Sequence, residues 1–189
     1  MIVVMPNGSI RLPGVSTTIV DRSSPAAIAA RIGAISKLHD TFAADLLTNI
    51  MPYVEKAYRT SARREQRAIA GLSMGGAETL RIAPSHLDTF AYIGVFSMGL
   101  QEGANAGVAP DFEARNAAFF ARPAETNRLL RLFWIGAGKN DQTVTDGPRR
   151  LSELLARRGI QHEFHESEGG HTWINWRRYL RDFVPRLFQ

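Results

Sequence analysis

The chain of 189 residues has no cysteine, which excludes disulfide bonds, thiol nucleophiles and thiolate metal sites. This absence fits an oxidising compartment and a reducing one equally. Long apolar runs are also missing, since no stretch approaches the roughly 20 residues that span a membrane. The first residues lack the basic segment that opens a signal peptide. We therefore expect no membrane partner.

Lysine is scarce, although the chain as a whole is basic. The 23 basic residues are 20 arginines and three lysines, and the formal net charge is +5. Adjacent arginines at 63–64, 149–150, 157–158 and 177–178 are spread along the sequence. A nucleic-acid interface needs its basic side chains on one face, so we expect scattered, solvated arginines and no nucleic-acid partner.

The residues that are present predict a single α/β domain over residues 1–189. Hydrophobic residues make up 44% of the chain and charged residues 22%, as in ordinary globular proteins. Apolar runs predict strands at 2–5, 67–72, 91–97 and 130–136, with a strand of mixed polarity at 161–166. Helices are predicted at 25–59 (kinked or restarted at Pro52), 76–83, 101–128 (short helices and a loop), 147–158 and 173–188. Strands that alternate with helices are typical of a mostly parallel sheet.

One serine lies where a predicted strand turns directly into a predicted helix, in the sequence Gly71-Leu72-Ser73-Met74-Gly75. This composition gives a Gly-x-Ser-x-Gly pattern by chance about 0.08 times per chain, so the strand and the helix around it carry more weight than the pattern. Together they predict the nucleophile elbow of an α/β-hydrolase. Gly71 and Gly75 are expected to leave room for the tight turn. The amide of Met74, at a helix N-terminus, is expected to donate to a developing oxyanion.

A serine nucleophile needs a histidine base, and the chain offers five histidines. His39 and His86 are expected at the surface or in helix caps. His162 and His165 miss the His-Glu-x-x-His spacing of a zinc site by one residue, so no metal is predicted there. His171 follows Glu-Gly-Gly in a loop between the last predicted strand and the last predicted helix. This position favours His171 as the base.

The carboxylate that orients the histidine is expected in the loop after the strand at 130–136. Asp141 lies in this loop, and functional groups in open parallel sheets gather at the carboxyl ends of strands. Asp146 is the nearest competitor, but its Asp-Gly-Pro sequence is typical of a turn into a helix. The chain order Ser73, Asp141, His171 is the order of nucleophile, acid and base in α/β-hydrolases.

Longer blocks of sequence resemble the esterase D and feruloyl esterase-like family of α/β-hydrolases, to which carbohydrate esterases of the acetyl xylan and ferulic acid type belong. The blocks are residues 2–8, 42–58, 67–76, 92–97, 136–141 and 169–173 with 176–177. The resemblance implies a three-layer α/β-hydrolase sandwich and a cofactor-independent serine esterase, with Ser73 as nucleophile, His171 as base and Asp141 as orienting acid. It implies acyl esters as substrates, often acetyl or feruloyl groups on plant polysaccharide.

The family pattern has one part that this chain lacks. Family members carry a further half-domain before the first strand predicted here, including a His-Gly loop that supplies a second oxyanion amide. The chain therefore resembles an N-terminally truncated hydrolase whose sheet has a gap or an unpaired edge, and an exposed apolar edge seeks pairing. We expect one of two repairs. Either the strand at 2–5 pairs with 67–72 and brings the amide of Asn7 or Gly8 to the nucleophile, or two chains share strands in a homodimer.

These observations favour a serine carboxylesterase that hydrolyses small or aromatic acyl esters, acetyl and feruloyl esters among them. The nearest alternatives are a thioester hydrolase of the S-formylglutathione type and a polyesterase. A non-catalytic binding module with a hydrolase fold is an alternative of another class. Ser97 and Met98, at the end of the next predicted strand, are expected to line the substrate pocket or to pack in a turn or the core. Trp173 is expected to stack on an aromatic or sugar group or to anchor its helix.

Overall fold

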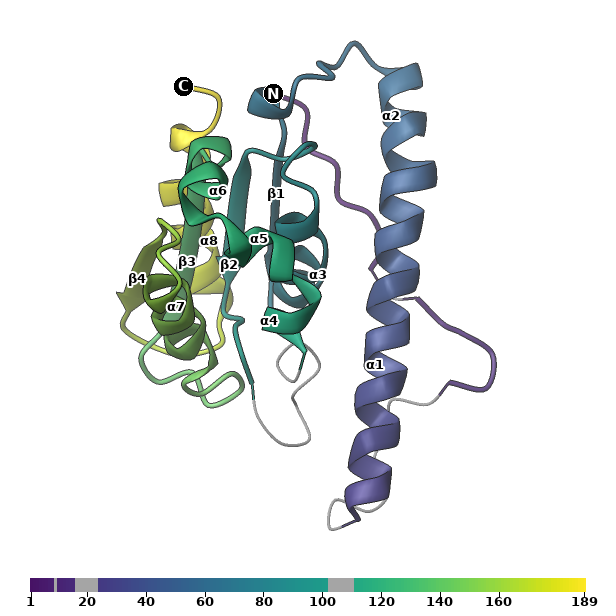
Figure 1. Cartoon of the computed structure of the whole chain (residues 1–189), viewed down its shortest axis with the longest axis vertical. Coiled ribbons are helices and arrows are strands. Elements are labelled where there is room, and N and C mark those ends of the chain that lie inside the picture. The colour runs from purple at the N-terminus through teal and green to yellow at the C-terminus, as the bar shows by residue number, and fades with distance from the viewer. Residues whose placement is uncertain (9, 16–23, 102–110) are drawn as a thin grey trace.

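The centre of the computed structural model is a four-stranded parallel sheet in the order β1-β2-β3-β4 (Figure 1). The structure describes residues 1–8, 10–15, 24–101 and 111–189. The strands are β1 (Ala68–Leu72), β2 (Tyr92–Phe96), β3 (Leu132–Gly138) and β4 (Glu163–Ser167). Their register aligns Leu72 with Phe96, Phe96 with Gly136, and Gly138 with Ser167. The carboxyl ends of all four strands therefore meet at one end of the sheet.

Helices cover both faces of the sheet and make a three-layer structure. One face packs against α3 (Met74–Ile82), α4 (Phe112–Arg115), α5 (Ala117–Ala121) and α7 (Gly147–Arg157), and the other against α8 (Trp173–Phe183). The remaining short elements are η2 (Arg64–Gln66), η3 (Ala83–Ser85), α6 (Pro123–Leu129) and η5 (Val184–Arg186). Because side chains alternate along a strand, Ile93 and Val95 enter the larger cluster while Tyr92 and Phe96 face α8.

A long helical rod stands on the β1 side of the sheet (Figure 1). It consists of α1 (Pro25–Asp45), a π-helical turn η1 (Leu46–Ile50) and α2 (Met51–Ala57). The predicted kink or restart at Pro52 takes the form of this π turn. Proline has no N–H for an α-helical bond, and the amide of Met51 donates to the carbonyl of Leu46, five residues back.

A polar cluster joins this rod to α3. Arg81 of α3 binds both carboxylate oxygens of Asp40 at 2.7 Å and also donates to Ser36. His39 is buried beside this ion pair, and burial together with the positive charge of Arg81 lowers its pKa to about 4. The expectation that His39 lies at the surface or in a cap is therefore wrong for this residue. The position of a histidine in the sequence of a helix does not tell whether its side chain is buried or at the surface.

The first residues of the chain do not form the predicted strand. Residues 1–5 lie outside the sheet, and their side chains are 46–88% exposed. In the view of Figure 1 the segment passes between β1 and α2. β1 keeps an open outer side in the sheet of the described residues, so the expectation that the strand at 2–5 pairs with 67–72 is wrong. Apolar composition favours a strand but does not by itself bring a segment into backbone pairing. The homodimer through this edge stays a prediction.

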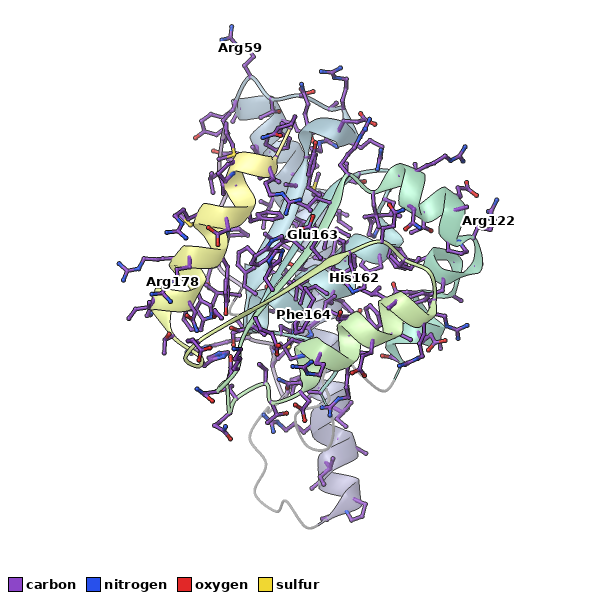
Figure 2. All side chains as sticks on the ribbon, turned by 90° about the vertical axis from the view of Figure 1, so that its left-hand side faces the viewer. Arg59, Arg122, His162, Glu163, Phe164 and Arg178 are labelled. Carbon is purple, nitrogen blue, oxygen red and sulfur yellow. The ribbon has the colours of Figure 1, made fainter. Side chains whose placement is uncertain are left out.

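The opposite edge of the sheet carries charge. Figure 2 looks onto β4, with α7 and α8 on its two sides, and labels Glu163 and Phe164 along the strand. Glu163 forms an ion pair with Arg186, which holds the pKa of that carboxyl at about 2. His165 stacks on Trp134 at 4.8 Å between ring centroids. Charged side chains on an edge strand discourage pairing with another chain. The β4 edge carries such side chains, whereas β1 has none.

Other boundaries differ by a few residues from the predictions. β3 begins two residues later than 130–136, and the last helix ends at Phe183 because Pro185 turns the chain into the short helix η5. Part of the segment predicted at 101–128 lies outside the described residues. The three arginines labelled in Figure 2 extend from different parts of the surface. No helix within the described ranges has both the length and the apolar character to cross a membrane.

Candidate active site

Ser73 lies on the turn that joins β1 to α3. Its backbone has φ 51° and ψ −117°, a left-handed conformation that residues other than glycine rarely adopt. Its amide donates to the carbonyl of Phe96 in β2 at 2.9 Å, and its carbonyl accepts from Ala77 in α3 at 3.1 Å. The neighbouring strand and the helix therefore hold the turn in place. This is the strained strand–turn–helix geometry that the sequence predicts.

Two glycines around the turn are required by close backbone contacts. A β-carbon on Gly71 would lie 2.0 Å from the carbonyl oxygen of Gly75. One on Gly76 would lie 2.7 Å from the β-carbon of Met98, so α3 approaches the end of β2 closely. Gly75 differs, because apart from its chain neighbours and the backbone of its own helix no atom of the described residues lies within 4 Å of an added β-carbon there. The expectation that Gly75 leaves room for the turn is therefore wrong.

The structure brings Ser73, His171 and Asp141 into one hydrogen-bonded chain. The distance from Ser73 Oγ to His171 Nε2 is 2.9 Å, and His171 Nδ1 lies 2.9 Å from Asp141 Oδ2. Because a carboxylate can only accept, Nδ1–H donates to Asp141, which leaves Nε2 free to accept the serine proton. The Asp141 side chain is fully buried, and its second oxygen accepts from the amides of Thr143 and Val144 at 3.0 and 3.3 Å. Asp146 is exposed.

The loops that carry Asp141 and His171 are bound to each other. The amide of Lys139 donates to Ser167, and the amide of Asn140 donates to Gly169, both at 2.9 Å. Gly169 adopts φ +86°, a conformation suited to glycine. These bonds extend the β3–β4 ladder beyond the last strand pair, so the acid and the histidine are held by the main chain as well as by their side chains.

The first amides of α3 point toward the site end of the sheet. Met74 is the first residue of α3, where backbone N–H groups have no acceptor inside the helix and the helix dipole is positive. An oxyanion role for this amide stays a prediction. Gly8 lies beside α3, where an added β-carbon would come within 3.0 Å of both carboxylate oxygens of Glu78. A donor role for Asn7 or Gly8 stays a prediction.

The three residues expected near the substrate lie in different environments. Ser97 is fully buried and Met98 is 9% exposed within the core cluster, so neither lines an open surface. The structure supports the alternative expectation, that these two residues pack in the core. Trp173 is 68% exposed at the start of α8, with its ring 5.1 Å from that of Trp176. Its contact with substrate stays a prediction.

His162, just before β4, and His165, within it, have structural partners. His162 accepts a hydrogen bond from Ser152 at 2.8 Å, since its Nδ1–H donates to the carbonyl of Ile160. His165 Nε2–H donates to the carboxylate of Glu163 at 3.0 Å, and its ring stacks on Trp134. In the described parts of the chain, no three acidic, histidine or cysteine side chains gather closely enough to hold a metal ion.

A family model described as "Putative esterase" matches residues 1–187. The chain belongs to this esterase family. A ferulic acid esterase structure from the anaerobic fungus Anaeromyces mucronatus is 26% identical, with a TM-score of 0.65 over 91% of this chain and 59% of that one. This likeness and the parallel sheet show an α/β-hydrolase fold.

Two curated relatives are also esterases by name. An endo-1,4-beta-xylanase/feruloyl esterase of Xylanibacter ruminicola is 27% identical over 161 residues, which cover 84% of this chain and 19% of that protein. An acetyl esterase of Caldicellulosiruptor saccharolyticus is 25% identical over 154 residues, which cover 69% of this chain and 58% of that protein. The chain thus spans less than two thirds of the length of each of these proteins.

Sequence reasoning missed two residues of the candidate site, both on α8. Asn175 is 1% exposed and donates to the carbonyl of Gly170 at 3.0 Å, which fastens the loop before His171. Trp176 packs against the His171 ring. The role of Asn175 could have been predicted from the sequence. An asparagine one turn after a candidate base, on the buried side of an amphipathic helix, needs a buried acceptor.

The chain also buries a carboxyl on α3, the helix that follows the Ser73 turn. Glu78 lies one turn after the nucleophile turn, is 7% exposed, and faces the backbone of Gly8. Burial raises the pKa of this carboxyl to about 7. Its pKa in the folded chain therefore lies above the usual value of 4.5, so the folded state holds the proton over a range of pH in which the unfolded state has released it.

This shift makes stability depend on pH in a defined direction. Between about pH 4.5 and 7 the folded state binds more protons, so Glu78 makes stability fall as pH rises. We expect Glu78→Gln to raise the free energy of unfolding by about 1–3 kcal/mol at pH 8 and to change it little at pH 4. Urea unfolding at the two pH values measures this, with exposed Glu153→Gln as the control. An equal effect of Glu78→Gln at both values would contradict it.

Proposed function

We propose that this chain is a serine carboxylesterase that hydrolyses small or aromatic acyl esters of the acetyl and feruloyl type through an acyl-enzyme on Ser73. The observation that carries the proposal is the continuous hydrogen-bonded chain from Ser73 Oγ through the imidazole of His171 to the buried carboxylate of Asp141. The names of the feruloyl and acetyl esterase relatives support the substrate class.

In the first half-reaction, Ser73 Oγ attacks the carbonyl carbon of the ester while His171 Nε2 takes the hydroxyl proton. The negative charge on the carbonyl oxygen accepts a hydrogen bond from the Met74 amide. Asp141 keeps the proton on Nδ1 and stabilises the imidazolium. When the tetrahedral intermediate collapses, the C–O bond to the alcohol breaks, the alcohol leaves with the proton from Nε2, and the acyl group stays on Ser73.

The second half-reaction repeats these roles with water. His171 Nε2 takes a proton from a water molecule, whose oxygen attacks the acyl carbon. Collapse of the second intermediate breaks the bond to Ser73 Oγ, which recovers its proton from Nε2, and the acid is released. Every proton is accounted for by one imidazole, and no cofactor is required by this scheme.

The test is covalent labelling with a fluorophosphonate, located by peptide mass analysis, together with hydrolysis of p-nitrophenyl acetate. We expect wild type to be labelled on Ser73 and Ser73→Ala to be neither labelled nor active. Ser152→Ala is the matched control, because Ser152 also bonds a histidine but lies outside the site. A wild type that neither labels nor exceeds Ser73→Ala in hydrolysis favours the non-catalytic binding module.

Substrate class is tested on a panel of esters from acetyl to feruloyl, with S-formylglutathione as the thioester arm. A solved S-formylglutathione hydrolase of Staphylococcus aureus shares the fold at 21% identity and a TM-score of 0.60. We expect higher kcat/KM on the oxygen esters. A preference for the thioester would replace the esterase proposal by its nearest alternative.

A further inference from the structure

The carboxyl end of β2 carries a second strained serine. Ser97 has φ 47°, is fully buried, and donates its amide to the carbonyl of Gly136 at 2.7 Å. A positive φ at a residue other than glycine is unfavourable and persists where the surroundings hold it. Because its side chain is inaccessible, Ser97 contacts no substrate. Its hydroxyl has one partner in the described residues, the indole of Trp176.

Trp176 links this serine to the histidine of the site. Its Nε1–H donates to Ser97 Oγ at 3.0 Å. The indole ring lies 4.9 Å from the His171 ring between centroids, at an angle of 89°. This edge-to-face geometry is favourable for aromatic pairs and restricts rotation of the imidazole. The end of β2, the first turns of α8 and the histidine loop are thus connected through side chains.

We propose that Ser97 and Trp176 are positioning residues for His171. They keep the imidazole ring in its catalytic orientation during deacylation, when the acylated Ser73 can no longer hold it. The inference rests on the proposed function. In the resting site both ring nitrogens are fixed, by Ser73 and by Asp141. Once Ser73 is acylated its hydroxyl proton is gone, and the imidazole keeps one hydrogen bond, to Asp141. The Trp176 ring then restricts the remaining rotation and keeps Nε2 aimed at the incoming water.

Two variants separate this role from a general structural one. Ser97→Gly removes the hydroxyl and also relieves the positive φ, so it weakens positioning without adding backbone strain. Trp176→Phe keeps an aromatic ring beside His171 and removes the indole donor. We expect each variant to lower the deacylation rate about tenfold, with a change in kcat/KM for p-nitrophenyl acetate of less than about twofold, because that ratio depends on acylation and not on deacylation. The acyl-enzyme should accumulate to a higher steady-state level, visible by intact-protein mass.

The double variant Ser97→Gly/Trp176→Phe supplies the decisive comparison. Because both changes remove the same hydrogen bond, we expect the double variant to lose about as much as the more impaired single variant, and losses that multiply would overturn the proposal. Leu155→Val, at a core residue of α7, controls for lowered stability and should keep the wild-type deacylation rate. If Trp176→Phe does not fold, Ser97→Gly carries the test alone.

Failure of the two proposals gives different results. Wild-type deacylation rates in both single variants, with wild type labelled on Ser73, overturn the positioning role and leave the esterase proposal standing. A wild type that is not labelled on Ser73 overturns both.

Discussion

Replacing His171 by alanine is expected to lower kcat for p-nitrophenyl acetate by about 10⁴-fold or more. The imidazole bridges Ser73 Oγ and the buried Asp141 carboxylate through two 2.9 Å contacts. Without it, the serine proton has no acceptor and the leaving alcohol has no donor. Steady-state kinetics with thermal unfolding of the same preparation measures the loss in a folded protein.

The double variant Ser73→Ala/His171→Ala tests whether the two residues act as one unit. We expect it to be no slower than either single variant, because removal of one member already disables the other. His162→Ala is the matched control, since His162 bonds Ser152 away from the site. Retention of more than about 1% of wild-type kcat in His171→Ala would contradict the assignment of His171 as the base.

Gly71→Ala is expected to cost the most stability of any single methyl group added at the elbow. Its β-carbon would lie 2.0 Å from a backbone oxygen in the first turn of α3, so β1 and α3 must separate or the turn must refold. We expect a loss of about 3 kcal/mol in the free energy of unfolding. We also expect kcat to fall about 100-fold, because a displacement of about 1 Å takes the Ser73 hydroxyl out of its reactive geometry. Urea unfolding and p-nitrophenyl acetate hydrolysis measure the two effects.

The chain provides its own control for this substitution. Gly75→Ala adds the same methyl group four residues later, where it meets no atom of the described residues. Since alanine favours a helix over glycine by about 1 kcal/mol, we expect Gly75→Ala to be as stable as wild type or slightly more so. Equal destabilisation by both substitutions would show that glycine content, and not the contact at Gly71, determines the stability of the elbow.

The four strands of the sheet and the three linked side chains of the site were predictable from local pattern. Apolar runs marked β1, β2 and β3, and the Gly-x-Ser-x-Gly turn placed Ser73 between a strand and a helix. Asp141 and His171 were found because parallel strands bring their carboxyl ends together, so a residue just after a strand is a site candidate whatever its distance in sequence.

What pattern did not predict depended on partners distant in the sequence. Residues 2–5 have the composition of a strand, but composition does not determine whether a segment pairs with the open edge of β1, and these residues lie exposed outside the sheet. His39 is buried because α3 lies beside its helix, and Ser97 is buried because Trp176, 79 residues later, covers it. Burial is a property of the assembled layers, and a helical or strand period alone does not determine it.

The candidate triad is distributed over the whole width of the sheet. Ser73 follows β1, Asp141 follows β3 and His171 follows β4, while β2 supplies the carbonyl that holds the Ser73 turn. No single strand–helix unit therefore contains a working site, and separating any one strand from the others takes the three side chains apart. Under the proposed function, enzymatic activity then reports the cooperative integrity of the entire sheet: ester hydrolysis and global unfolding should share one midpoint in denaturant.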